Sequence, residues 1–244
     1  VEEAMSAAAW AIIVVNGKAG VETGTKKAWN LCEKYNLPRL IYVSNMDIDN
    51  SSFKNVLEDL TNEYGKKIAP FHFPIRENEK FVGYVNVLAE KAYRWNDKGE
   101  AVECEIPDYS KDNLEIYRSS LMEAVAETSE EFMERYFNGE DFSEAEMRAA
   151  LHASVCDGSI VPMTMGSSTL IQGIYTLLDD CVKYLPSPEG RKVSGINTAS
   201  NEIFEADYDF SKPKSAIVWK TIIDPFIGKY SIFKVNSGVF KTGD

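Results

Sequence analysis

A short apolar run that ends in polar residues is the stretch of this sequence whose residue types could do chemistry. Leu40–Val43 is apolar or aromatic throughout and is followed by Ser44, Asn45 and Asp47. Open α/β sheets bind ligands just outside the carboxyl ends of their strands, so we expect these side chains to face a ligand. The two oxygens of the Asp47 carboxylate could accept both edge N–H groups of a guanine base, which adenine cannot match. The pattern fits a base-reading loop, but the local sequence alone favours a solvated turn before a helix.

Elements with regular spacing surround this loop and must position it. Apolar runs alternate with segments whose apolar residues recur at helical spacing. Ser51 or Ser52 would cap the helix after the loop, and Gly65 would end it. The alternation predicts an α/β fold with a doubly wound, mostly parallel sheet. The expected strands are 8–15, 40–43, 67–75 and 160–165, and the expected helices are 28–35, 53–64 and 170–184, the last with Leu170 and Leu178 on its core face.

The alternation of strands and helices is interrupted between residues 69 and 157, where short strands come first and helices follow. Ser143 and Glu146 have the spacing of a capping box at the start of the last of these helices. This order of elements predicts an α+β subdomain inserted into the parallel fold. Residues 189–213 lack periodicity and are expected to form a surface linker. The remaining expected elements are strands at 84–88, 92–95, 102–106, 215–220 and 230–235, and helices at 113–127, 129–137 and 143–157.

The predicted insertion is strongly acidic. Between Glu100 and Glu146 there are 15 acidic residues and three basic ones, a net charge of −12 that equals the charge of the whole chain. Acidic surfaces repel phosphate backbones, so direct contact with RNA or DNA is not expected, whereas a basic protein would be attracted and steered. The alternative is a solvated surface that only aids solubility.

Motifs along nearly the whole chain resemble those of translation elongation factor G, in the same order. They are Asn16–Thr25, Lys34–Arg39, Met46–Asp47, Met165–Ser168, Tyr184–Pro188, Asp224–Lys229 and Val235–Val239. By this resemblance Ser44, Asn45 and Asp47 occupy the first guanine loop, and Ser167 and Ser168 occupy the second. Members of the family have Asn-Lys-x-Asp where this sequence has Ser-Asn-Met-Asp, so the lysine of the motif is absent and only the position of the carboxylate matches. The expected contact with guanine therefore depends mainly on Asp47.

The resemblance also implies a domain division and partners. It implies part of a P-loop GTPase G domain at 1–68 and 158–188, the insertion at 69–157, a linker at 189–211 and the first strands of a domain II β-barrel at 212–244. GTP with Mg²⁺ would bind the intact protein, which would act on the ribosome in GTP-driven translocation or a related step. The insertion would face a basic ribosomal stalk protein through Glu123, Glu127 and Glu131.

The phosphate-cradling motif G-x-x-x-x-G-K-[ST] does not occur in the 244 residues. We therefore expect a fragment of such a GTPase that is inactive and holds no cofactor by itself. The alternative is a regulatory or ribosome-binding paralogue of the same fold that does not hydrolyse GTP. A metal- or thiol-dependent enzyme is more distant, because His152 and Cys156 are only two ligand types four residues apart. No apolar run has membrane-spanning length, and a cytoplasmic location is expected.

Overall fold

The computed structural model describes residues 1–189 and 192–244. It divides into two compact units, one formed by Trp10–Leu185 and the other by Val1–Ala9 together with Pro186–Asp244. Within the described ranges, none of the helices combines the length and the apolar character needed to cross a membrane.

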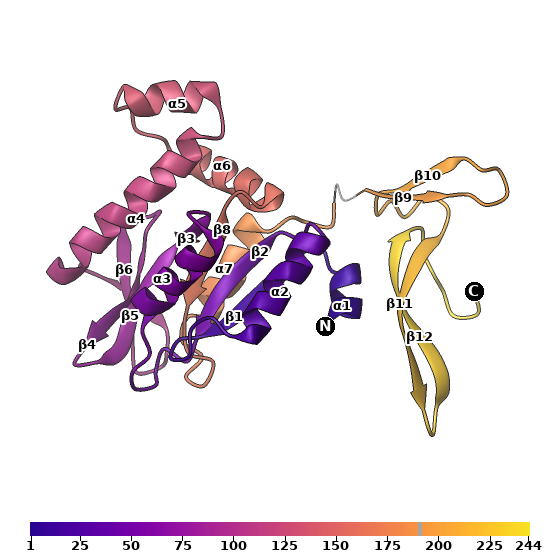
Figure 1. The fold of residues 1–244 in the computed structure, drawn as a ribbon, viewed down its shortest axis with the longest axis horizontal. Helices are drawn as coiled ribbons and strands as arrows, with labels where there is room; N and C mark the ends of the chain where they lie inside the picture. Colours follow the sequence, from indigo (N-terminus) through magenta and orange to yellow (C-terminus); the bar gives the residue numbers. More distant parts are fainter. Residues whose placement is uncertain (190–191) are drawn as a thin grey trace. The chain divides into compact units, whose positions relative to one another are not determined.

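A four-stranded parallel sheet is the centre of the larger unit, with strand order β1-β2-β8-β3. Its middle strands β2 and β8 are almost entirely buried, as expected for strands covered on both faces. Helices α2 and α3 are drawn in front of the strands and α7 behind them (Figure 1). The strands are β1 (Ala11–Asn16), β2 (Arg39–Ser44), β8 (Val161–Met165) and β3 (Ile68–Pro70), and the helices are α2 (Thr23–Lys34), α3 (Phe53–Tyr64) and α7 (Ile174–Tyr184).

Local capping chemistry sets several helix ends where the sequence predicts them. The Ser52 hydroxyl accepts a hydrogen bond from the Asn55 amide at the start of α3, which ends at Gly65. Ser143 and Glu146 form the expected capping box at the start of α6. The fold prediction of an α/β sheet with an additional α+β region is confirmed.

The insertion carries an antiparallel sheet and three helices. Its strands are β4 (His72–Glu77), β5 (Lys80–Asn86), β6 (Lys91–Trp95) and β7 (Ala101–Cys104), in that order across the sheet. Its helices are α4 (Asp108–Ala126), α5 (Glu130–Phe137) and α6 (Glu144–Asp157), and α5 lies farthest from the parallel sheet (Figure 1). The prediction of a single strand at 67–75 is wrong, because two strands, β3 and β4, occupy this region. The chain leaves the parallel sheet at the fully buried Phe71, whose amide donates to the Met163 carbonyl, and β4 then begins the second sheet.

Helix α7 begins later than expected. Gly173 has a φ of 81°, a left-handed conformation that glycine adopts without steric cost, and the helix starts only after it. Leu170 and Leu178 are 51% and 54% exposed, so the prediction that they belong to the core is wrong. The segment from Gly166 to Gly173 forms a folded loop instead of a first helical turn, because the backbone amide of Ser167 donates a hydrogen bond to the Gln172 carbonyl.

The smaller unit contains α1 and two antiparallel pairs of strands. Helix α1 (Glu2–Ala7) precedes β1, which begins at Ala11 rather than at the expected residue 8. Strands β11 (Ser215–Asp224) and β12 (Gly228–Ser237) confirm the expected pair. The linker prediction missed the hairpin of β9 (Val193–Ile196) and β10 (Ile203–Ala206), because neither strand alternates clearly between apolar and polar residues. Gly190 and Arg191 of that segment lie outside the described residues.

Candidate functional site

Two predicted loops meet at the carboxyl edge of the parallel sheet. Strand β2 lies beside β8, so the first loop (Ser44–Ser51) and the second loop (Gly166–Gln172) leave the sheet next to each other. The Gly166 amide donates to the Val43 carbonyl over 2.9 Å, and the Met46 amide donates to the Gly166 carbonyl over 3.1 Å. The loops are therefore tied by backbone hydrogen bonds, as a ligand site shared between them requires.

The first loop holds its polar side chains in different ways. The Ser44 hydroxyl donates to the Val15 carbonyl of β1 over 3.3 Å and so faces the neighbouring strand. Asn45 has a φ of 59°, a left-handed conformation that asparagine tolerates better than most residues. Asp47 is half-buried, and its Oδ1 atom is buried without a hydrogen-bond partner among the described residues. A buried carboxylate oxygen without a partner is rare, and a ligand that donates hydrogen bonds would satisfy it.

Tyr42 lies under the two loops and responds to the charge of Asp47. Its side chain is 3% exposed, and burial together with the negative charge of Asp47 raises the pKa of its hydroxyl to about 12. The hydroxyl is therefore a neutral phenol at physiological pH. A side-chain carbon on Gly166 would lie 2.4 Å from this hydroxyl oxygen and 2.3 Å from the Gln172 carbonyl oxygen. Only glycine fits at this point of the second loop.

The serines of the second loop have separate roles. Ser167 is fully buried, and its hydroxyl accepts the Leu170 amide over 3.1 Å, which closes the turn. Ser168 is exposed beside it. The structure thus brings both serines to the edge that carries Asp47, with only Ser168 open to solvent.

Three residues that sequence reasoning did not assign to the site support the first loop. Gly17 donates from its amide to the Ser44 carbonyl over 2.9 Å. The Ser51 hydroxyl donates within the loop to the Ile48 carbonyl over 2.9 Å. Arg76, from β4 of the insertion, donates to the Met46 carbonyl over 2.7 Å. No local pattern could have indicated Arg76, because its partner is 30 residues away in the sequence.

The predicted partner-binding glutamates cluster where two helices of the insertion meet. Glu123 lies in the last turn of α4, Glu127 is the C-cap of that helix and Glu131 lies in the first turn of α5. All three side chains are exposed. The negative end of the α4 dipole faces Glu123 and Glu127 without a basic residue in that turn, which disfavours this arrangement unless a cation approaches.

The histidines occupy structural positions. His72 Nε2 lies 3.0 Å from Asp180 Oδ2, and both side chains are 4% exposed, so the pair joins β4 to α7. His152 Nε2 lies 3.6 Å from Cys156 Sγ within α6. Across residues 1–189 and 192–244, no group of three or more His, Cys, Asp or Glu side chains is placed to hold a metal ion.

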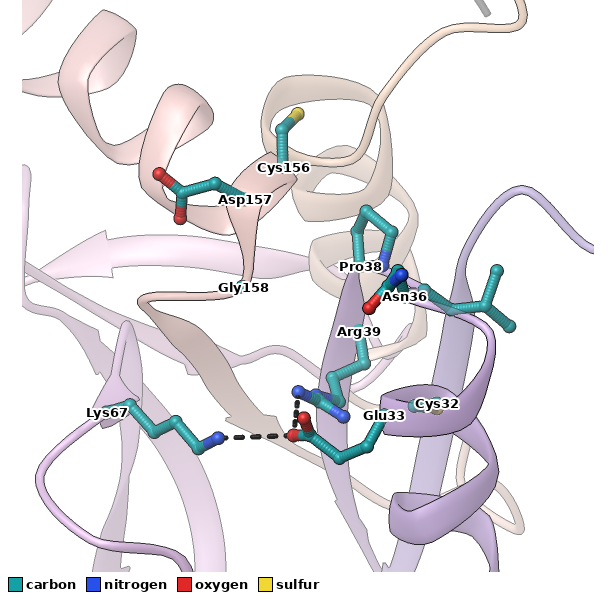
Figure 2. A pocket seen from close by; sticks show the side chains of 10 residues that line it. Cys32, Glu33, Asn36, Pro38, Arg39, Lys67, Cys156, Asp157 and Gly158 are labelled. Carbon is teal, nitrogen blue, oxygen red and sulfur yellow. Dashed lines mark hydrogen bonds and ion pairs between the residues drawn. The ribbon is translucent and has the colours of Figure 1, made fainter. Parts of the chain in front are cut away.

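A polar pocket lies at the opposite, amino-terminal edge of the sheet. Figure 2 shows the Glu33 carboxylate between Arg39 and Lys67, with distances of 2.5 and 3.2 Å from its Oε1 atom. The Arg39 guanidinium also lies 4.1 Å from the centre of the Trp29 ring. Because the Glu33 carboxylate contacts both cations, we interpret the cluster as a structural contact that joins α2, β2 and the residue before β3.

Comparison with known proteins agrees with this architecture. Residues 1–187 match the model of the family described as Elongation factor Tu GTP binding domain. A crystal structure of a protein from Thermus thermophilus is similar, with a TM-score of 0.81 and 31% sequence identity over 100% of this chain and 34% of that chain. The chain thus spans about a third of that protein's length. The resemblance to a translational GTPase of the elongation factor type is confirmed, and the chain belongs to the elongation factor Tu GTP binding domain family.

Proposed function

We propose that the carboxyl edge of the parallel sheet reads the guanine base of GTP in a translational GTPase that acts on the ribosome. The observation that carries this proposal is the buried, unpartnered Oδ1 atom of Asp47, at the point where the two loops are hydrogen-bonded to each other. A guanine base offers two N–H donors side by side, and a carboxylate accepts both. The family to which the chain belongs supports GTP as the nucleotide.

The five predicted site residues differ in their proposed parts, and only Asp47 and Ser168 are assigned to contact the base. Asp47 accepts the two guanine N–H groups. The Ser167 amide already donates a hydrogen bond to the Gln172 carbonyl. We therefore assign the contact with the guanine oxygen to Ser168, which is exposed. Ser44 and Asn45 shape the first loop, through the bond to Val15 and the left-handed turn. We assign base recognition to Asp47 and Ser168, and we assign neither phosphate binding nor Mg²⁺ binding to any of the five.

The test is a titration of the ¹⁵N-labelled chain with GMP, AMP and XMP, followed by NMR. GMP should shift the amide signals of Asp47 and Ser168 with a dissociation constant of about 1 mM, because a base without strong phosphate contacts offsets little of the cost of binding. Asp47→Asn should weaken GMP about tenfold and relax its preference over XMP, because an amide donates where the carboxylate accepted. Asp49→Asn, at an exposed position of the same loop, is the control. Equal shifts with GMP and AMP would contradict the proposal.

A second candidate is a regulatory paralogue that binds the ribosome without hydrolysing GTP. The observation in its favour is the sequence Ser44-Asn45, which replaces the usual Asn-Lys and removes a lysine that would lie along the base. Phosphate release by the protein as isolated from its source, measured with ribosomes present, separates the two candidates. Ribosome-stimulated hydrolysis would eliminate the paralogue.

We further propose that the acidic insertion contacts the basic ribosomal stalk protein. Glu123, Glu127 and Glu131 are exposed, and a cationic partner would relieve the repulsion at the end of α4. Opposite charges raise the rate of encounter more than they tighten binding, so the contact should be weak and should disappear near 1 M salt, where screening acts over about 3 Å. Reversing the three glutamates to lysine should abolish the low-salt shifts in an NMR titration with the stalk domain. Unchanged binding would leave the acidic surface with a role in solubility only.

A further inference from the structure

Arg76 connects the insertion to the first loop. One terminal nitrogen of its guanidinium donates to the Met46 carbonyl over 2.7 Å and also to the Ser51 hydroxyl. The other terminal nitrogen donates to the Glu79 carbonyl over 2.6 Å. No ion pair with a carboxylate is formed by Arg76 in the part of the chain that the structure describes. Its guanidinium donates to neutral oxygens instead, two of them in the first loop and one in the turn between β4 and β5.

The insertion aims this side chain with specific backbone features. The register of β4 against β5 shifts between Ile75, which is opposite Gly83, and Arg76, which is opposite Phe81. Strand β5 thus carries one extra residue, Val82, beside Arg76, and such an irregularity bends the sheet locally. Asn78 and Glu79 both have positive φ, the conformation of a tight two-residue hairpin turn, which places the Glu79 carbonyl within reach. The Tyr109 hydroxyl of α4 donates to the Arg76 carbonyl over 3.1 Å. Arg76 is thus held from both sides by the insertion itself.

The group that Arg76 holds comes directly before the proposed base reader. Met46 is fully buried, its amide donates to the Gly166 carbonyl, and its carbonyl accepts from Arg76. The carbonyl belongs to the peptide plane that joins Met46 to Asp47. Fixing both sides of Met46 therefore fixes the direction in which the Asp47 side chain leaves the backbone.

We propose that Arg76 is a positioning residue that holds the first loop in the shape with which Asp47 reads guanine. The proposal rests on the function proposed above, since it concerns the same carboxylate. Because Arg76 belongs to the insertion, a partner that displaces β4 would also change base affinity, and a bound base would change the affinity of that partner by the same factor.

The experiment compares Arg76→Gln and Arg76→Lys with Arg94→Gln in the full chain. Arg94 is the matched control because it lies in β6 of the same sheet and pairs with Glu77 over 2.5 and 2.9 Å, away from the first loop. Hydrogen–deuterium exchange of Ser44–Ser51 is measured first, and then GMP affinity by NMR. Arg76→Gln should speed exchange of the loop and weaken GMP, each by about tenfold, because a charged hydrogen bond is lost. Arg76→Lys keeps the charge and should recover part of the wild-type protection from exchange and part of the GMP affinity.

The outcomes separate this inference from the function on which it rests. Faster loop exchange with weaker GMP binding in Arg76→Gln, and neither in Arg94→Gln, supports the positioning role. If wild type binds GMP and Arg76→Gln binds it equally, or if loop exchange does not change, the inference is wrong while base recognition stands. If wild type gives no GMP-specific shifts, the proposed function fails and the inference fails with it.

Discussion

Replacing Gly166 by alanine should destabilise the larger unit and disturb both loops of the site. The added carbon would lie 2.3 Å from the Gln172 carbonyl oxygen, 2.4 Å from the Tyr42 hydroxyl and 3.2 Å from the Gly173 Cα atom. Two of these contacts are with backbone, and Tyr42 is 3% exposed, so none of the three can move aside easily. Overpacking of this kind costs about 1–3 kcal/mol. At about 2–4 °C per kcal/mol for a unit of this size, Tm should fall by about 2–12 °C.

Circular dichroism during urea and thermal unfolding measures this loss, since all helices except α1 lie in the larger unit among the described residues. Gly24→Ala in α2 is the control, because no atom lies within 4 Å of the added carbon and alanine favours helix by about 1 kcal/mol. Tyr42→Phe in the Gly166→Ala background should restore part of the loss by removing one of the close contacts. Wild-type stability of Gly166→Ala, or an equal loss in Gly24→Ala, would refute the reasoning.

Two further predictions concern charged groups away from the site. Hydrogen bonds from Arg135 and Ser143 lower the pKa of Glu146 to about 2, so its stabilising effect is complete above the ordinary carboxyl pKa near 4.5 and is lost as the pH falls towards 2. Urea unfolding between pH 5 and 2 should therefore show a smaller loss of stability for Glu146→Gln than for wild type, and parallel losses would exclude this role. Arg39→Met should lower the free energy of unfolding by about 1–3 kcal/mol, because a 5% exposed cation loses its carboxylate and aromatic contacts. The control, Lys54→Met, breaks the exposed ion pair between Lys54 and Glu58, whose charged atoms are 3.9 Å apart, and should change the free energy of unfolding by less than about 0.5 kcal/mol. Equal effects of the two substitutions would show that burial of Arg39 contributes nothing.

Helix ends and the loop after β2 could be predicted from the sequence because they depend on neighbouring residues. Ser52 and Ser143 cap their helices through amides three residues away. The apolar run of β2 and the polar residues after it predict both the strand and the position of Asp47 at its carboxyl end. Resemblance to a known family added the second loop, which no local rule would have paired with the first.

Local rules failed where remote segments compete for the same residues. The run 67–75 is expected to be one strand, yet the chain changes sheets at Phe71, because β3 has a partner in β8 while β4 pairs with β5. The spacing of Leu170 places it in line with the core face of α7. Residues 167–172 instead form the turn of the second loop, because the Ser167 amide donates to the Gln172 carbonyl. Periodicity describes what one segment prefers, and the tertiary partners decide between equal preferences.

The buried strand β2 and the polar loop after it, which contains Asp47, follow from the sequence alone, whereas folding determines which residues surround Asp47. Strand β8 lies beside β2 although the whole insertion separates them in the chain, and this adjacency places Gly166 against Met46. Arg76 reaches the same residue from the insertion, 30 residues away in the sequence, where the register of β4 against β5 is irregular. A carboxylate in a loop is common in sequences. Contacts from remote segments, which only folding brings together, hold this one with a buried oxygen that has no hydrogen-bond partner among the residues that the structure describes.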